Sequence, residues 1–299
     1  MTVSDVPVDE FDKLFYGDPK EIEQRLLVVR PQSLTHSDES LTPQIDSQIA
    51  LVQAMQKRYA EAFETLDRAE KLPGATNPLA RVRLLLERGR VFQQAKRMEE
   101  AVPWLVASWE ISSAHSLDYH TVNAAHMVAI AVGSPAEKIR WNQIALDVAD
   151  ASGDEKAQAW RVVLHNNLAQ AFVAAGEFGN GLASFQSCQN LAREQGNVLI
   201  ERGARWGIAR CRRGLGDQAT ALQIQQELLK EYNEVESQGL LPQELLGMAR
   251  GMVYEELAEL DRQNAAMFAK HAISDLGVND WFESIEPARW QRLKTMAGN

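Results

Sequence analysis

Three side chains between residues 206 and 213 have the types and spacing needed to hold an acidic group. Arg210 and Arg213 lie three residues apart, and Trp206 lies four residues before Arg210. On a helix these intervals place all three side chains on one face. A guanidinium group holds a carboxylate through two parallel hydrogen bonds. The pattern therefore predicts a ligand that carries acidic side chains or a C-terminal carboxylate.

Amide side chains form a second group with binding chemistry. They are Asn123, Asn166, Asn167 and Gln170. A carboxamide has one acceptor and two donors, so it can bond the backbone of a peptide whatever the side chains of that peptide are. Two other interpretations stay open. The amides could cap turns or bond between helices, and the arginines could pair with acids on neighbouring helices.

Motifs that support catalysis or metal binding do not occur in the sequence. It contains no HExxH, GxSxG, P-loop or GxGxxG pattern. The histidines lack metal-ligand spacing on a common helix face, and His120 and His126, for example, are six residues apart. Glu255, Glu256 and Glu259 are interpreted as a solvated acidic face of a helix. We therefore predict no catalytic residue, no metal and no cofactor.

The composition is that of an ordinary helical globular protein. Of 299 residues, 45% are hydrophobic and 24% are charged, and good helix formers are abundant. The net charge of −10 argues against a general affinity for nucleic acid or for an anionic membrane. The arginines near residue 210 could instead bind RNA, but they lie on only one predicted helix of this acidic chain.

Cysteine content and hydropathy favour a cytoplasmic protein. Cys188 and Cys211 are too few for a disulfide framework and are expected to be buried as small apolar side chains. The N-terminal residues include early acids and lack the apolar segment of a signal peptide. No run of 18 apolar residues, which a membrane span would need, occurs.

A helix–turn–helix pattern recurs along the chain. In its clearest copy, at 166–191, Ala169 and Gly181 allow two helices to approach closely and three phenylalanines fill the surrounding space. Similar patterns occupy 49–69, 84–108 and 204–229, and a weaker copy lies around 127–145, with Pro135 expected at the start of its second helix. Repetition of one helical unit predicts an elongated stack of helix pairs.

These positions resemble the tetratricopeptide repeat over about residues 46 to 275, with copies offset by about 37 to 43 residues instead of the usual 34. The chain also resembles a microbial subgroup of tetratricopeptide proteins with no established activity. That likeness rests on Trp141 and on HMVAI (126–130), HNNLA (165–169), ARW (204–206), VYEELAEL (253–260) and EPARWQRL (286–293). It implies an all-α fold, a right-handed superhelical solenoid of helix–turn–helix repeats with terminal capping helices.

The resemblance also implies where a ligand would bind. Stacked helix pairs form a concave groove lined by the first helix of each pair. The repeat register places in that groove Arg90, Asn123, Asn166, Asn167, Gln170, Trp206, Arg210 and Arg213. In tetratricopeptide proteins that bind peptides, asparagines on the first helix often bond the peptide backbone, which the likeness suggests for Asn166 or Asn167. The expected function is non-catalytic binding of a protein or peptide segment. The alternative is a regulatory sensor of a small ligand or signalling peptide, and an enzyme is favoured less.

A single structural domain in three parts is expected. Residues 1–48 are assigned to capping helices and a polar linker at 32–48, residues 49–276 to five or six helix pairs, and residues 277–299 to a C-terminal capping helix. The turn before the last pair's second helix is shortened to DRQN, which leaves the register of 261–276 open.

Overall fold

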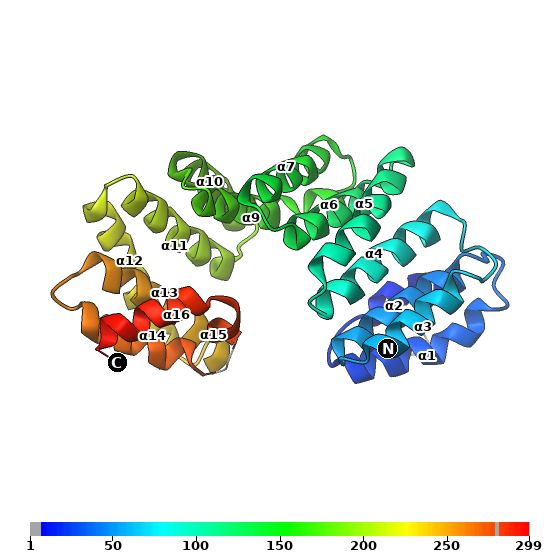
Figure 1. Ribbon diagram of the computed structural model, residues 1–299, viewed down its shortest axis with the longest axis horizontal. Helices are drawn as coiled ribbons and strands as arrows, with labels where there is room; N and C mark the ends of the chain where they lie inside the picture. The colour runs from blue at the N-terminus through cyan, green and yellow to red at the C-terminus, as the bar shows by residue number, and fades with distance from the viewer. Residues whose placement is uncertain (1–6, 279–280, 299) are drawn as a thin grey trace. The chain divides into compact units, whose positions relative to one another are not determined.

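A computed structural model describes residues 7–278 and 281–298, which fold into helices and contain no strand (Figure 1). The first part of this chain comprises the 3₁₀-helix η2 (Val8–Leu14) and α1 (Pro19–Ser33), α2 (Leu41–Met55), α3 (Tyr59–Ala69), α4 (Pro78–Gln94), α5 (Met98–Ala114), α6 (Asp118–Ala131), α7 (Pro135–Ala151) and α8 (Glu155–Gln158). It is followed by α9 (Arg161–Ala174), α10 (Phe178–Glu194), α11 (Val198–Gly214), α12 (Gln218–Ser237), α13 (Gln243–Leu260), α14 (Ala265–Leu276), α15 (Trp281–Ile285) and α16 (Pro287–Ala297).

The chain divides into two compact units. The first unit extends to Leu164 and the second begins at His165, so the division falls within α9. These units do not coincide with the predicted division at 48/49 and 276/277. Within each unit, consecutive helices pack against one another, for example α4 on α5 and α10 on α11. The predicted all-α fold of paired helices is confirmed.

Seven of the turns between helices share one backbone geometry. Positive φ angles occur in these turns at Lys57, Lys96, Ser116, Gly176, Gly196, Gly216 and Gly239. In each case the next residue donates its N–H to a carbonyl oxygen five residues earlier in the chain. The bond from Arg58 to Gln53, for instance, is 2.9 Å long. It satisfies a carbonyl that the helix end leaves free, and its recurrence marks one repeated structural unit.

Small residues allow the closest contacts between helices. A Cβ atom added at Gly89 on α4 would lie 2.5 Å from the side chain of Leu105 on α5. A Cβ atom at Gly207 on α11 would lie 2.3 Å from the ring of Phe185 on α10. Neither space can hold another carbon, because packed atoms do not approach so closely. The small–large pattern in the sequence therefore corresponds to helix–helix contacts.

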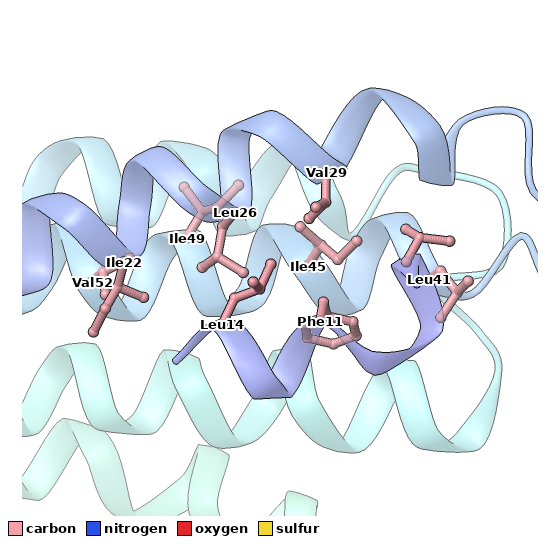
Figure 2. Close-up of a cluster of buried hydrophobic side chains, with 10 residues drawn as sticks. Phe11, Leu14, Ile22, Leu26, Val29, Leu41, Ile45, Ile49 and Val52 are labelled. Atoms are coloured by element: carbon pink, nitrogen blue, oxygen red, sulfur yellow. The ribbon is translucent and has the colours of Figure 1, made fainter. Parts of the chain in front are cut away.

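Residues 9–30, predicted as an N-terminal cap, form two helical segments, η2 and α1. Side chains of η2, α1 and α2 form one buried apolar cluster, to which η2 contributes Phe11 and Leu14 (Figure 2). Asp18 caps the first turn of α1 by accepting a hydrogen bond from the Lys20 N–H at 2.9 Å. The cap covers the apolar face of the first repeat helix.

The predicted linker at 32–48 is wrong over its second half, because α2 begins at Leu41. Leu41, Ile45 and Ile49 lie four residues apart and face the cap cluster. The polar residues between them find internal partners: the Arg30 guanidinium donates both its Nε and its Nη2 to the Asp46 carboxylate. A segment that is polar in composition is therefore buried, since its polar groups are paired.

The C-terminal segment, predicted as one capping helix, contains two helices, α15 and α16. The structure fixes the open register of 261–276, with α13 ending at Leu260 and α14 beginning at Ala265. α16 packs on α14, and the buried Trp290 and Leu293 of α16 join the apolar cluster there.

The predicted helix start at Pro135 is also found. Pro135 lies at the first position of α7, where the helix needs no N–H donor from it.

Candidate functional site

A hollow of about 950 Å³ opens in the first unit. Its lining comes from η2 and the residues after it, from α2, α4 and α6, and from the segment running through α8 into the start of α9. α2, α4 and α6 are the first helices of three successive pairs. This cavity, which we name the first-unit hollow, therefore occupies the surface that the repeat pattern assigns to a ligand within this unit.

Asn123 contributes an unpaired amide to the first-unit hollow. The residue lies on α6 and is only 7% exposed. Its Oδ1 is buried and accepts no hydrogen bond from the described part of the chain. Leaving a buried acceptor unpaired costs about 1–3 kcal/mol, which a donor entering the hollow would recover. Asn123 is one of the residues that the sequence placed in a binding groove.

Arg90 lines the same hollow from α4. Its side chain is 29% exposed, and its Nη1 lies 3.4 Å from each carboxylate oxygen of Glu87. These contacts are long for charge-assisted hydrogen bonds. Glu87 is buried and also accepts a bond of 3.1 Å from Nε2 of Gln48. Arg90 therefore keeps donor capacity for a ligand, while Glu87 has its own internal partners.

Two further polar residues of the hollow were not selected from the sequence. Arg83 lies on α4 seven residues before Arg90, and His120 lies on α6 three residues before Asn123. Residues three or seven positions apart lie on the same face of a helix. The spacing from Arg90 and from Asn123 could therefore have identified Arg83 and His120 from the sequence. The Nδ1 atom of His120 and the Nε atom of Arg83 are buried without a hydrogen-bond partner in the described residues.

The hollow keeps His120 neutral. Burial, with a smaller contribution from the positive charge of Arg83, lowers the pKa of His120 to about 4. The side chain therefore offers a neutral imidazole at pH 7, with one ring nitrogen as donor and the other as acceptor. Arg83 itself is held by Asp12, which accepts from Nη1 at 2.8 Å and from Nη2 at 2.6 Å.

The other predicted site residues belong to the second unit. Asn166, Asn167 and Gln170 are half-buried on α9, and Nδ2 of Asn166 donates to Oδ1 of Asn167 at 3.3 Å. Trp206 on α11 is buried, and its Nε1 donates to the carbonyl oxygen of Met252 at 3.0 Å. The indole of Trp206 therefore holds α11 against α13.

Arg210 and Arg213 hold an internal carboxylate. Arg213 donates to Glu256 from Nε at 2.9 Å and from Nη2 at 3.1 Å. Nε of Arg210 lies 3.2 Å from the same carboxylate, and its guanidinium stacks 4.9 Å from the Trp206 ring centroid. Burial lowers the pKa of Arg210, whereas at Arg213 the hydrogen bonds and the charge of Glu256 outweigh burial and raise the pKa.

The predicted solvated acidic face on α13 is wrong. Glu255 and Glu256 are both only 1% exposed. Glu255 accepts a hydrogen bond of 2.9 Å from Nε of Arg289 on α16, and Nη2 of Arg292 lies 3.2 Å from it. The two carboxylates lie inside the second unit because arginines from α11 and α16 compensate their charge there.

Cys188 and Cys211 are free and buried, as predicted. Burial raises the pKa of each thiol to about 11. The described residues contain no group of three or more His, Cys, Asp or Glu side chains arranged to hold a metal ion. Among these residues, no helix combines the length and apolar character that a membrane span requires.

Paired helices, the recurring turn and the terminal caps define a helical-repeat protein with the tetratricopeptide fold, as the sequence predicted. No protein-family model matches the sequence, and no curated protein matches it. Among solved structures, the apo form of RapI has a TM-score of 0.72 at 13% identity, over 97% of this chain and 80% of RapI. NprR in complex with its cognate peptide NprX has a TM-score of 0.56 at 14% identity, over 96% of this chain and 81% of NprR.

A third similar structure is a signal transduction ATPase with a tetratricopeptide repeat sensor from Pyrococcus horikoshii. Its TM-score is 0.64 at 13% identity, over 97% of this chain and 45% of the ATPase. This chain thus spans less than half the length of that protein. At these identities the likeness shows the fold and leaves function to the residues of this chain.

Proposed function

We propose that this chain is a non-catalytic module that binds a peptide segment, and that the first-unit hollow is a binding site for it. The observation that carries the proposal is the Oδ1 atom of Asn123, buried at the hollow without a hydrogen-bond donor from the described residues. A peptide backbone supplies N–H donors at every residue except proline. One such N–H would satisfy Asn123 without reading the peptide's side chains.

The surroundings of Asn123 suit an extended peptide. Leu79, Leu86 and Val163 give the hollow apolar wall area, and Trp160 adds an aromatic surface. The rest of the lining is polar or charged, and it includes the donors Arg90 and Lys156 as well as the amide of Asn123. The likeness to NprR, whose structure was solved with a cognate peptide, supports the same interpretation.

The proposed peptide carries acidic side chains or a C-terminal carboxylate. In the first unit this acidic character depends on Arg90, whose bonds to Glu87 are long. In the second unit it depends on Arg210 and Arg213, and there a ligand carboxylate would have to share the guanidinium groups with Glu256. Asn166, Asn167 and Gln170 are proposed as backbone contacts of the second unit.

A phage-displayed library of random dodecapeptides, selected on the immobilised chain, tests the proposal. The dissociation constants of selected peptides are then measured for wild type, Asn123→Ala and Gln143→Ala. Gln143 is an exposed amide on α7 that bonds Asp147, outside the hollow, so it is the matched control. Asn123→Ala should weaken binding about tenfold, since one neutral hydrogen bond is lost, and Gln143→Ala should leave it unchanged. Failure to select any peptide, or equal affinities for all three proteins, would overturn the proposal.

A further inference from the structure

Arg83 has the geometry of a carboxylate-binding residue. Its side chain lines the first-unit hollow from α4 and is 12% exposed. Nη1 and Nη2 donate to the two oxygens of Asp12, at 2.8 Å and 2.6 Å. Two parallel bonds from one guanidinium are the arrangement by which arginine recognises a carboxylate. Nε is buried and has no hydrogen-bond partner in the described chain.

Asp12 reaches Arg83 from the solvent side. Its side chain is 58% exposed, and it belongs to η2, 71 residues earlier in the chain. η2 packs on α1 and α2, and Phe11 and Leu14 anchor it in the apolar cluster of the cap (Figure 2). The cap is therefore held by apolar burial that does not involve the carboxylate of Asp12.

Arg83 favours a carboxylate at its own end of the hollow. Burial raises the pKa of Asp12, but the hydrogen bond and the charge of Arg83 outweigh burial and lower it. His120, beside them, is neutral, so it neither repels nor neutralises a carboxylate. Lys156 adds a positive charge to the lining, and Asp154 adds a negative one. The guanidinium of Arg83 would stabilise a ligand carboxylate at this position as it stabilises that of Asp12.

We propose that Arg83 is the carboxylate-binding residue of the first-unit hollow and that Asp12 is a built-in competitor that occupies it until an acidic peptide enters. The inference rests on the proposed function, because it requires a peptide in the hollow. The incoming carboxylate replaces Asp12 on the same guanidinium nitrogens, so one ion pair is exchanged for another and no charge is left buried alone. Asp12 thereby lowers the affinity for acidic peptides and excludes those that bind weakly.

Three fluorescein-labelled heptapeptide pools serve as probes, each with six positions randomised among uncharged residues. The first pool has a fixed central aspartate and an amidated C-terminus. The second has a central asparagine and an amidated C-terminus. The third has a central asparagine and a free C-terminal carboxylate, so the pools distinguish a side-chain carboxylate from a terminal one. Fluorescence anisotropy gives an apparent dissociation constant for each pool with each protein.

The proteins are wild type, Asp12→Asn, Arg83→Gln, the double variant, Asn123→Ala and Glu100→Gln. Glu100 accepts two bonds from Arg97 at the start of α5, outside the hollow, so Glu100→Gln frees an arginine of the same kind elsewhere. Thermal unfolding of Asp12→Asn, expected to match wild type, verifies that η2 stays in place.

Asp12→Asn should bind at least one carboxylate pool about two- to fivefold more tightly than wild type, which is what removal of a partly exposed ion pair allows. Its affinity for the neutral pool should not change. In the double variant, Arg83→Gln should abolish the tighter binding that Asp12→Asn produces. Glu100→Gln should not change the affinity for any pool. If Asp12→Asn tightens no carboxylate pool, or tightens all three pools equally, the inference is overturned. The proposed function then still stands, provided that Asn123→Ala weakens every pool. If no pool binds any protein, or Asn123→Ala has no effect, both fail.

Discussion

Arg213 donates two hydrogen bonds to Glu256, from Nε at 2.9 Å and from Nη2 at 3.1 Å, and so joins α11 to α13 inside the second unit. Arg210 approaches the same carboxylate, with its Nε at 3.2 Å. Two arginines that the sequence pattern assigns to a ligand thus have an internal carboxylate as partner. The arrangement makes Glu256 a structural residue whose loss leaves positive charge without compensation.

Removing the charge of Glu256 should destabilise the second unit. Glu256→Gln keeps the shape of the side chain but leaves Arg210 and Arg213 without their counter-charge, which is expected to cost roughly 2–4 kcal/mol. The free energy of unfolding in urea measures this loss. Glu244→Gln, at an exposed position on the same helix, is the control and should change stability by less than about 0.5 kcal/mol. Equal stability of the two variants would contradict this role of Glu256.

Two glycines on α11 should respond in opposite directions to alanine. Gly207→Ala places a methyl group 2.3 Å from the Phe185 ring, and such overpacking is expected to cost about 1–3 kcal/mol or more. Gly203 has no atom within 4 Å of an added Cβ. Gly203→Ala should therefore stabilise the helix by about 0.5–1 kcal/mol. Thermal unfolding of both variants compares them, and a tolerated Gly207→Ala would show that α10 and α11 are packed less closely than described.

The C-terminal cap should depend on Leu293. This side chain is fully buried in the cluster that α16 forms with α14. Leu293→Ala is expected to cost about 2–5 kcal/mol by leaving a cavity, and amide hydrogens of α16 should then exchange faster with solvent. Gln291→Ala, exposed on the same helix, should leave exchange as in wild type. Unaltered protection of α16 in Leu293→Ala would mean that the cap is held by its ion pairs alone.

Acidification should weaken the first unit through His126. Burial, with a smaller contribution from the charge of Arg90, lowers the pKa of His126 from 6.5 to about 4. Between pH 6.5 and about pH 4 the unfolded chain binds a proton at His126 that the folded chain does not. The contribution of neutral His126 to the free energy of unfolding is therefore fully present above pH 6.5 and is lost as the pH falls through this range. His126→Gln should lessen the loss between pH 7 and pH 4.5 by roughly 1–3 kcal/mol.

Urea unfolding at pH 7 and pH 4.5 gives that difference. His115→Gln, at an exposed position, is the control and should show the same loss as wild type. A loss in His126→Gln as large as in wild type would indicate that His126 becomes protonated in the folded protein as readily as in the unfolded chain.

The sequence predicts the helices well because apolar periodicity and small residues are local signals. The turn at Gly176 is predicted by its glycine, whereas the same left-handed geometry at Lys57 and Lys96 has no such marker. In those two turns the hydrogen bond to the carbonyl five residues earlier, not the residue type, selects the conformation.

The site is harder to predict because burial of charge depends on partners far along the chain. Glu255 is paired with Arg289, 34 residues later, and nothing near it in the sequence indicates this. Arg90 and Asn123 line one hollow, as the repeat register implied, since equivalent helices stack side by side. Asp12 could not be placed there from the sequence, because only the fold of the N-terminal cap brings η2 to α4.

A crystal structure of the chain with a selected peptide tests the proposed binding site most directly. We predict peptide density in the first-unit hollow, with a backbone N–H within hydrogen-bond distance of Oδ1 of Asn123. For an acidic peptide we also predict a carboxylate on Arg83 and Asp12 displaced from it. Peptide bound elsewhere, with the hollow unchanged and Oδ1 of Asn123 still unpaired, would contradict the assignment of the hollow as the peptide site.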